Sequence, residues 1–582
     1  MSPYRWVRAL RGISAAAASI ALIGGAVAAP AYAGTAPAPG SNPAVSYQDP
    51  VDALPPVSRP DTEHCAVTAV DHDFGYTLGG PPYTTTLTPP ARCEGPWNKV
   101  VLDWSGSVKG RQYDRLAAVF VGGAEVFRTS TAEPDDDGIS WHVAKDITEF
   151  APLLKDPQKL QLELGNVVNG TYTGVYHVKL TITYYRADRR HPAATTADRI
   201  VPLGNTASTD APWLSVGKGG STSTDVTFPR NLTGARLQVY ARGGGCDEQW
   251  FDAVPSDLAA TAPDYLCGGG PYREVQVTVD GRPAGLAQPY PVVYSGGIVP
   301  TLWRPIPAID QFRTEAYDID LTPFAGELAD GRPHAIGITP YGAADTWIVD
   351  GSLFLDTDAH ASRTSGQVTV NTLTGTPAVK TVQTPREDGS THVSVSTGRS
   401  WKISGYVRTS KGRVTTTVEQ EFAYTNTDTV SRTGQQQTMH QRDHGSTTVT
   451  TRTGGRTSAQ RHAWSYPIDV DMDIPVYGDY NNYDLRAAVT QRRVLIDTSR
   501  TGSARVWRTD AVTDDTVDST GNLARTGGVV TAADGASAEK YRGTTDTGAC
   551  YSRVLESAHG WITSDQESRC RVADVVREAL KG

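Results

Sequence analysis

Residues 176–185 read Tyr176-His-Val-Lys-Leu-Thr-Ile-Thr-Tyr-Tyr185, and this stretch decides the fold class of the chain. Apolar or aromatic residues alternate with polar ones, which is the pattern of a β-strand with one buried face. Arg273-Glu-Val-Gln-Val-Thr-Val279 alternates in the same way and runs into Asp280-Gly281, a hairpin signal. Many short runs of this kind, separated by turn residues, predict an all-β chain built from jelly-roll or β-sandwich domains.

Helical periodicity is scarce, and it is clearest at the C-terminus, where apolar residues form one stripe over 572–580. Asp469-Val-Asp-Met-Asp473 resembles the opening of a calcium-binding loop, but it lacks the glycine and the distal glutamate that such a loop needs. Its alternation of acidic and apolar residues favours a strand instead.

Two pairs of segments repeat in the same order and predict a duplicated unit. Asp146-Ile-Thr-Glu-Phe150 matches Asp320-Leu-Thr-Pro-Phe324, and residues 113–123 upstream match residues 271–281. A repeat that spans a strand, a turn and a later motif indicates two related sandwiches in tandem.

A length of 582 residues leaves room for several domains of roughly 100–200 residues each. Composition, turn signals and the repeat divide the chain into five parts. They are a signal peptide (1–33), a flexible leader (34–64), a first jelly-roll domain (65–190), a second jelly-roll domain (191–358) and an additional C-terminal β-rich accessory region (359–582).

The composition is that of a globular protein, with 38% hydrophobic and 20% charged residues. The net charge is -9 and no basic block occurs, which disfavours nucleic-acid binding through neutralisation of phosphates.

The N-terminus has the three parts of a secretory signal peptide. Arginines in the first eleven residues precede an apolar stretch over 13–29, and Ala31-Tyr-Ala33 then offers small residues around a cleavage point after Ala33. An uncleaved membrane anchor is the alternative. No later stretch has the ~20 apolar residues of a membrane span, so we expect a secreted protein without stable membrane association.

The six cysteines fit an exported protein, because disulfides form in oxidising compartments. They lie in three couples that are close in sequence, and each couple falls in a region of its own. We therefore expect the disulfides Cys65–Cys93, Cys246–Cys267 and Cys550–Cys570. A zinc site is disfavoured, since the chain contains no Cys-x-x-Cys motif.

Familiar catalytic motifs are absent from the sequence. There is no HExxH, no Walker A loop and no GxSxG elbow, and paired cysteines leave no thiol nucleophile. Carboxylates, aromatic residues and arginines in glycine-rich loops remain, notably in residues 109–115 and 242–250. This set of residues suits carbohydrate recognition and carboxylate-assisted hydrolysis.

Asp114 stands at the start of a predicted strand and has the opposite parity to that strand's apolar set, so it is expected to face away from it. Glu274 has the same relation to the strand that follows it. In the repeat, Tyr272 takes the place of Asp114. Without further information these acids read equally well as surface residues in loops.

The chain resembles the PNGase A family of peptide-N4-(N-acetyl-β-glucosaminyl)asparagine amidases over nearly its whole mature length. The segments that carry the resemblance are His72-Asp-Phe-Gly-Tyr76, Trp97-Asn-Lys-Val-Val-Leu-Asp-Trp104, Lys109-Gly-Arg-Gln-Tyr-Asp-Arg115, Arg128-Thr-Ser-Thr-Ala-Glu-Pro134, Thr171-Tyr-Thr-Gly-Val-Tyr-His177, Tyr272-Arg-Glu274, Asp318-Ile-Asp-Leu-Thr-Pro-Phe324 and Cys550-Tyr-Ser-Arg553. A secreted bacterial member is expected, more distantly similar to the PNGase F enzymes.

That similarity implies two jelly rolls with the active site between them. It points to Asp114 as the catalytic aspartate and to a supporting glutamate in the second domain, for which Glu248 and Glu274 are both candidates. A further acid of the PNGase F enzymes falls near Asn166, which departs from their pattern and leaves a third acid open.

The implied function is that of a secreted glycoamidase that hydrolyses the asparagine amide to N-acetylglucosamine in N-glycosylated peptides or proteins. No metal or other cofactor is expected, and the expected state is a monomer. The expected catalytic residues are Asp114, Glu248 and Glu274. The expected substrate-binding residues are Arg111, Arg115, Glu133, Trp141, Asn166, Trp250 and Arg273.

Two other readings stay open. One is a secreted β-sandwich protein that binds glycans without cleaving them, and the other is a glycosidase that cuts within the sugar core. Trp141 and Trp250 fit stacking on sugar rings and fit core packing equally well.

Overall fold

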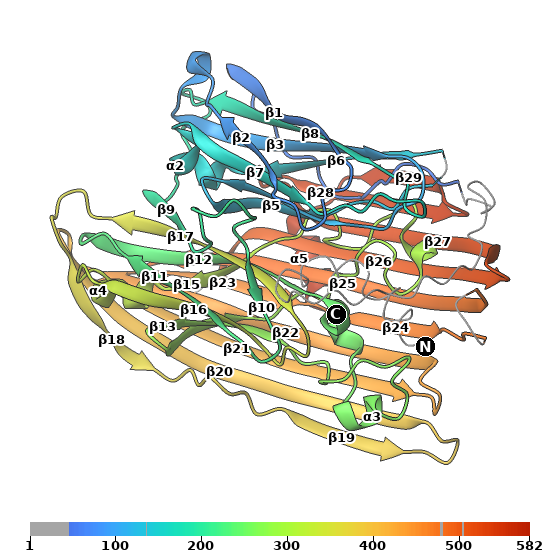
Figure 1. The fold of residues 1–582 in the computed structure, drawn as a ribbon. Helices are drawn as coiled ribbons and strands as arrows, with labels where there is room; N and C mark the ends of the chain where they lie inside the picture. The colour runs from blue at the N-terminus through green and yellow to red at the C-terminus, as the bar shows by residue number, and fades with distance from the viewer. Residues whose placement is uncertain (1–45, 136, 478–480, 503, 505, 582) are drawn as a thin grey trace.

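The computed structural model describes residues 46–135, 137–477, 481–502, 504 and 506–581. The predicted signal peptide and the first part of the predicted leader lie outside these residues. Nearly all regular elements in the described part are strands (Figure 1), so the prediction of an all-β chain is confirmed.

Eight strands form a first jelly roll. They are β1 (His64–Phe74), β2 (Tyr83–Leu87), β3 (Trp97–Val108), β4 (Leu116–Val121), β5 (Ala124–Ser130), β6 (Ile139–Asp146), β7 (Gln158–Leu164) and β8 (Tyr176–Arg186). Their orders are β1-β8-β3-β6 in one sheet and β2-β7-β4-β5 in the other, the interlocked arrangement of a jelly roll. The connections contain the short turns η1 (Ala91–Cys93), η2 (Thr148–Phe150) and α2 (Ala151–Leu154).

The second jelly roll repeats this order strand for strand, as β10-β17-β12-β15 and β11-β16-β13-β14, with β9 (Arg199–Pro202) added beside β17. Its strands are β10 (Leu214–Val216), β11 (Thr222–Thr227), β12 (Leu232–Gly243), β13 (Glu274–Val279), β14 (Arg282–Ala287), β15 (Tyr317–Asp320), β16 (Pro333–Tyr341) and β17 (Trp347–Thr357). Its short helical turns are η3 (Gly245–Asp247), η4 (Trp250–Asp252), α3 (Ser256–Ala259), η5 (Pro300–Trp303), η6 (Thr322–Phe324) and α4 (Ala325–Leu328).

The sequence repeat has a structural basis. Asp146 Oδ1 accepts the backbone N–H of Thr148 at 2.9 Å, and Asp320 Oδ1 accepts that of Thr322 at 2.8 Å. Each aspartate thus opens a 3₁₀ turn that continues into one turn of α-helix at the same place in its jelly roll. The predicted duplication is confirmed.

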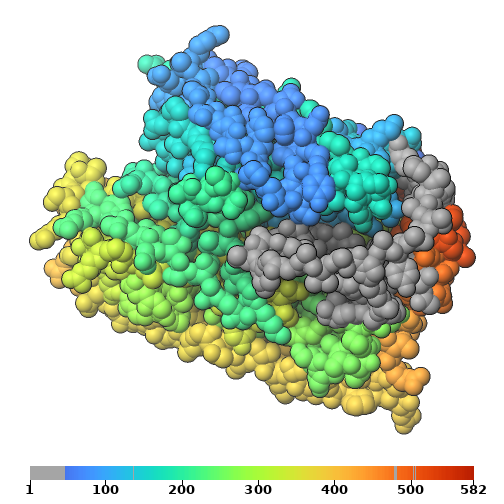
Figure 2. Space-filling view, viewed as in Figure 1, coloured from blue at the N-terminus to red at the C-terminus, as the bar shows by residue number. Residues whose placement is uncertain are grey.

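The C-terminal region is a twelve-stranded sheet that underlies both jelly rolls in Figure 1. Figure 2 shows the first jelly roll at the top and the first strands of this sheet along the lower edge. The strands are β18 (Ser365–Asn371), β19 (Lys380–Pro385), β20 (Thr391–Thr409), β21 (Gly412–Val430), β22 (Gln436–Thr453), β23 (Arg456–Ser465), β24 (Ile468–Asp473), β25 (Tyr483–Thr501), β26 (Arg508–Thr526), β27 (Val529–Thr544), β28 (Cys550–Ala558) and β29 (Trp561–Ser568).

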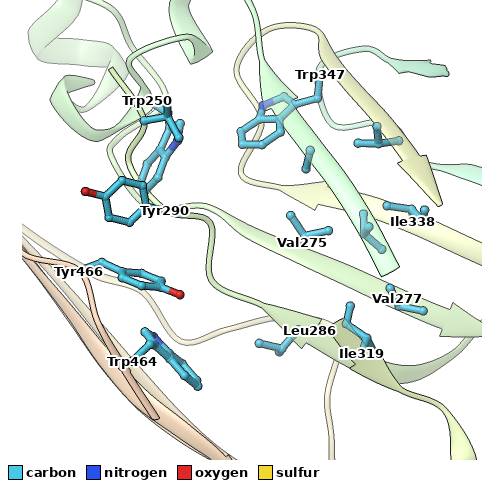
Figure 3. Packing of buried hydrophobic residues seen from close by; sticks show 14 of the residues in the cluster. Trp250, Val275, Val277, Leu286, Tyr290, Ile319, Ile338, Trp347, Trp464 and Tyr466 are labelled. Carbon is cyan, nitrogen blue, oxygen red and sulfur yellow. The ribbon is translucent and has the colours of Figure 1, made fainter. Parts of the chain in front are cut away.

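One continuous apolar core joins the second jelly roll to this sheet. The rings of Tyr290 and Tyr466 meet edge to face with centroids 5.2 Å apart (Figure 3). The predicted apolar stripe at the C-terminus forms α5 (Val572–Ala579), which buries Val575 and Ala579 against another part of the sheet. The C-terminal region is therefore packed against the second jelly roll, not suspended from it.

Three disulfides join the expected pairs of cysteines. The Cα atoms are 5.9 Å apart in Cys65–Cys93, 5.4 Å in Cys246–Cys267 and 5.5 Å in Cys550–Cys570. Each bridge closes a loop within one unit, and no free cysteine occurs among the described residues.

A long connection between β14 and β15, which we call the 288–316 segment, contacts the first jelly roll. It contains no strand and only one short turn, η5. Ser130 at the end of β5 donates its N–H and its hydroxyl to the Gln311 carbonyl at 3.2 and 2.9 Å. The Thr314 N–H donates to the Arg128 carbonyl at 3.2 Å. The segment thereby extends the edge of β5.

Residues 46–63 belong to the leader predicted to be flexible, and in the structure they lie between the first jelly roll and the C-terminal sheet. The Ala53 N–H donates to Glu539 Oε2 at 2.7 Å, and the Ser58 hydroxyl donates to Asp546 Oδ2 at 2.9 Å. Tyr47 and Ala53 are buried. These contacts tie the start of the first jelly roll to the last strands of the chain.

Candidate functional site

Asp114 and Arg115 end the loop that leads into β4, and both are buried, at 2% and 5% exposure. The backbone of Arg115 pairs with Thr131, which follows β5. The Arg115 N–H donates to Thr131 Oγ1 at 2.8 Å, and its carbonyl accepts the Thr131 N–H at 2.9 Å. This pairing fixes Asp114 between the ends of two neighbouring strands.

Asn166 holds the Arg115 side chain in place. Arg115 donates from Nε to Asn166 Oδ1 at 3.3 Å and from Nη2 to Gln112 Oε1 at 2.5 Å. The Asn166 amide in turn donates to the carbonyls of Phe74 and Gly174 at 3.0 and 3.1 Å. A neutral amide therefore stands next to the arginine and fixes the position of its guanidinium.

Glu133 approaches Asp114 from the loop after β5. Its carboxylate accepts the backbone N–H of Asp114, and it pairs with Arg304 of the 288–316 segment at 2.9 Å. Burial raises the pKa of Glu133, and the charge of Arg304 acts in the opposite direction. Glu133 thus connects the Asp114 loop with the second jelly roll.

Gly296 is shaped to the same carboxylate. Its φ is +79°, and a Cβ atom at this position would lie 2.8 Å from Glu133 Cδ and closer still to Oε1. Only glycine allows both this backbone conformation and this approach. The next residue, Gly297, packs against the side-chain amide of Gln249, which lies in the Cys246–Cys267 loop.

Tyr176 ties the loops of the two acids together. Its hydroxyl contacts the Tyr113 carbonyl at 2.6 Å and the Ala132 carbonyl at 3.1 Å, which are the residues just before Asp114 and Glu133. Burial raises the pKa of this hydroxyl well above its usual value. Tyr176 therefore stays a neutral donor that sets the spacing between the two loops.

Glu248 belongs to the second jelly roll, and the residue after it, Gln249, contacts Gly297. Its carboxylate is 3.6 Å from Arg242 Nη2, and both side chains are buried. The Arg242 guanidinium lies over the Tyr294 ring, 4.1 Å from the centroid. Gln249 follows Glu248 and lies against Gly297, while the Glu133 carboxyl lies against Gly296. The loop of Glu248 and the Glu133 carboxyl therefore contact adjacent residues of the 288–316 segment.

Glu274 has a different environment. At the start of β13 it is fully buried, and it accepts hydrogen bonds from the Tyr272 hydroxyl at 2.6 Å and from Arg399 of the C-terminal sheet at 2.5 Å. These partners come from its own jelly roll and from β20. The structure thus groups Glu248 with the Asp114 side of the molecule and Glu274 with the C-terminal sheet.

Residues 54–374 match the family described as peptide N-acetyl-beta-D-glucosaminyl asparaginase amidase A, and residues 392–468 match the PNGase A C-terminal domain. The peptide-N4-(N-acetyl-beta-glucosaminyl)asparagine amidase A of Prunus dulcis is 34% identical over 403 residues, which cover 66% of this chain and 70% of that protein. The chain belongs to the PNGase A family. The resemblance inferred from the sequence is confirmed at this level.

Solved structures give weaker likenesses. PNGF-II shows 14% identity and a TM-score of 0.35, over 55% of this chain and 64% of that one. Recombinant peptide: N-glycanase F (PNGase F) shows 16% identity and a TM-score of 0.33, over 50% of this chain and 96% of that one. Both scores are too low to bear on the fold or on the function of this PNGase A family member.

The remaining predicted site residues take two kinds of position in this PNGase A family chain. Arg273 is 1% exposed and pairs with Asp247 at 2.5 Å, and Asp247 also accepts the Trp347 indole N–H at 2.7 Å. Trp250 is buried beside Tyr290 (Figure 3). Arg273 and Trp250 thus pack inside the second jelly roll.

Arg111 and Trp141 lie on the first jelly roll. The Arg111 guanidinium is 5.8 Å from the centroid of the half-buried Tyr172 ring. Trp141 stacks on Phe312 of the 288–316 segment, with centroids 6.2 Å apart. Its indole N–H is buried and has no hydrogen-bond partner among the described residues.

Sequence reasoning missed Arg304, Gly296 and Tyr176 as parts of the site. Arg304 and Gly296 lie in a segment without strand periodicity, so the alternation of residues gave neither of them a role in the site. Tyr176 is the first residue of an alternating strand, and that pattern predicts a buried apolar side chain. It does not indicate that the Tyr176 hydroxyl makes hydrogen bonds in the site.

Within the described ranges, no group of three or more His, Cys, Asp or Glu side chains could hold a metal ion. No helix in that part of the chain is long and apolar enough to span a membrane.

Proposed function

We propose that this PNGase A family member hydrolyses the side-chain amide between asparagine and N-acetylglucosamine, releasing the N-glycan and leaving aspartate in the peptide. The observation that carries the proposal is the meeting of Asp114, Glu133 and Arg304 at the junction of two jelly rolls. It places carboxyl groups and a cation from different units around one position.

Amide resonance makes the carbonyl carbon a poor target for water, so the enzyme must both activate the water and stabilise the oxyanion. The Asp114 carboxylate takes a proton from the attacking water as its oxygen bonds to the amide carbon. Arg115 lies next to Asp114 and supplies positive charge toward the negative oxygen of the tetrahedral intermediate. Asn166 keeps this guanidinium in position.

The carbon–nitrogen bond then breaks, and the departing nitrogen must receive a proton. Glu133 suits this step, because burial raises its pKa and favours the protonated form. The products are an aspartate side chain and a glycosylamine, which later loses ammonia to water. The cycle ends when the proton on Asp114 is returned to Glu133 through solvent.

We propose Glu248, not Glu274, as the supporting acid of the second jelly roll. Glu248 precedes the residue that contacts the Gly296–Gly297 turn, whereas Glu274 is engaged by Tyr272 and Arg399. Glu248 and Arg242 then form the second-unit side of the site, and Glu274 helps to hold the C-terminal sheet.

We also propose that the chain is a secreted, monomeric bacterial enzyme with a distant relation to the PNGase F enzymes. Support for export comes from the signal-peptide pattern of residues 1–33 and from three disulfides. The strand order of the two sandwiches supports the proposed domains 65–190 and 191–358, with 359–582 as the third unit. The partner is an N-glycosylated peptide or protein.

Incubation of a defined N-glycopeptide in water enriched in heavy oxygen tests the function directly. An amidase converts Asn to Asp and places one heavy oxygen in the peptide. A glycosidase leaves a sugar on Asn, and a glycan-binding protein leaves the peptide unchanged, so either result would replace the proposal.

A further inference from the structure

Where the turn η5 of the 288–316 segment packs on the C-terminal sheet, the sheet lacks side chains at two opposed positions, Gly521 and Gly535, which we call the Gly521–Gly535 dent. Gly521 of β26 and Gly535 of β27 are cross-strand partners in the sheet. A Cβ atom at Gly521 would lie 2.7 Å from Thr301 Oγ1, and one at Gly535 would overlap the Thr301 carbonyl oxygen. Two opposed glycines therefore make room for the turn η5, which contains Thr301.

Hydrogen bonds fix the turn in this dent. Thr301 Oγ1 donates to the Asn522 carbonyl at 3.1 Å, and the Ser537 hydroxyl donates to the Leu302 carbonyl at 2.9 Å. Ser537 is buried, at 5% exposure. The contacts are thus made by two neighbouring strands and hold both the backbone and a side chain of the turn.

The turn held in this way belongs to the loop that reaches Glu133. Gly296 lies five residues before Thr301 and Arg304 lies three residues after it. The Trp303 indole N–H donates to the Gly297 carbonyl at 2.9 Å and closes the loop on itself. A displacement of Thr301 would therefore be passed to both groups that touch the Glu133 carboxyl.

We propose that the C-terminal sheet positions the catalytic carboxyls, acting through the Gly296–Arg304 loop that its Gly521–Gly535 dent holds against Glu133. Gly521, Gly535 and Ser537 are positioning residues for amide hydrolysis. The C-terminal region is then a working part of the enzyme and not an accessory domain. This inference rests on the proposed function of the Asp114–Glu133 site.

Gly535→Ala is the decisive variant, with Gly405→Ala as its matched control. Gly405 lies in β20 of the same sheet, and a methyl there would overlap the backbone of Pro323 in η6, far along the sheet from the dent. Both variants thus push the sheet away from the second jelly roll, and only Gly535→Ala does so beneath the loop. Ser537→Ala is a milder second variant, which removes one hydrogen bond without adding volume.

We measure kcat and KM on a defined N-glycopeptide and hydrogen exchange in residues 296–304. The proposal expects kcat of Gly535→Ala to fall by ~10²-fold, since a shift on the order of 1 Å in a reacting group has that effect. It expects a smaller loss for Ser537→Ala, faster exchange in the loop for both, and kcat near wild type for Gly405→Ala. Stability should fall in both glycine variants.

The inference is overturned if Gly535→Ala retains the wild-type kcat although the loop exchanges faster, or if Gly405→Ala loses as much kcat as Gly535→Ala. It is also overturned if exchange in residues 296–304 is unchanged in the folded Gly535→Ala and Ser537→Ala proteins. A wild-type enzyme that leaves the Asn–sugar amide intact would instead refute the proposed function, and the exchange data would still report whether the sheet holds the loop.

Discussion

The contact between Gly296 and Glu133 offers the sharpest test of how the site is assembled. In Gly296→Ala, the added methyl would stand 2.8 Å from Glu133 Cδ and closer to Oε1, whereas real Cβ contacts are essentially never shorter than 3.0 Å. The carboxyl or the turn must therefore move by several tenths of an ångström or more. With displacements on the order of 1 Å costing ~10²-fold in rate, we expect kcat to fall by roughly one to two orders of magnitude.

The same change also forces a non-glycine residue into a left-handed conformation, at a cost of about 1–2 kcal/mol in stability. Gly281→Ala isolates this cost, because Gly281 has a φ of +74° and a Cβ there would meet nothing within 4 Å. Kinetics on a defined N-glycopeptide and thermal unfolding are measured for both variants. Equal stability losses with a rate loss confined to Gly296→Ala support the reasoning. A kcat for Gly296→Ala within twofold of that for Gly281→Ala would refute it.

Three further predictions concern acids of the chain. Glu248→Gln should reduce kcat strongly, whereas Glu274→Gln loses the ion pair with Arg399 and should mainly reduce stability. Kinetics and thermal unfolding of both variants test this, and the reverse pattern would exchange the roles of the two acids. Burial raises the pKa of Glu133, so a rate that needs its protonated form should fall as pH rises through that pKa. The pH–rate profile of Glu133→Gln should lack this decrease at alkaline pH. If the decrease persists in the variant, the proton comes from another group. Asp443 is buried in β22 of the C-terminal sheet, and burial raises its pKa from the ordinary 3.8 to about 7. Between these two pH values the folded chain keeps a proton that the unfolded chain has lost. The free energy of unfolding should then fall as pH rises from about 4 to about 7, and Asp443→Asn should weaken this dependence. If the melting temperature of Asp443→Asn changes with pH as steeply as that of wild type, the prediction is wrong.

Regular alternation made much of the fold readable from the sequence. The run from residue 176 became β8 (Tyr176–Arg186), and the run from residue 273 became β13, followed by a hairpin at Asp280-Gly281 as predicted. Residues 469–473 lie in β24, as their alternation favoured over a calcium loop. These elements are set by local patterning of polar and apolar residues, which a single sequence displays.

The candidate site was only partly readable, because its geometry depends on contacts between distant parts of the chain. Asp114 could be singled out by its place before a strand and by the family resemblance. Arg304, by contrast, meets Glu133 across 171 positions from within an irregular segment. Glu248 and Glu274 look alike in the sequence, and it is tertiary contacts that distinguish them: Tyr272 and Arg399 engage Glu274, whereas the residue after Glu248 contacts Gly297.

Conversion of a defined N-glycopeptide by wild type and by Asp114→Asn, followed by mass spectrometry of the peptide in water enriched in heavy oxygen, tests the central claim most directly. Asn keeps the size of the side chain and removes its charge, so the variant should fold. We predict that wild type produces heavy-oxygen Asp at the glycosylation site and that Asp114→Asn does so at a rate at least ~10²-fold lower, the scale expected for a lost general base. A well-folded Asp114→Asn enzyme that forms labelled Asp at a near-normal rate would contradict the assignment and move the general base elsewhere in the site.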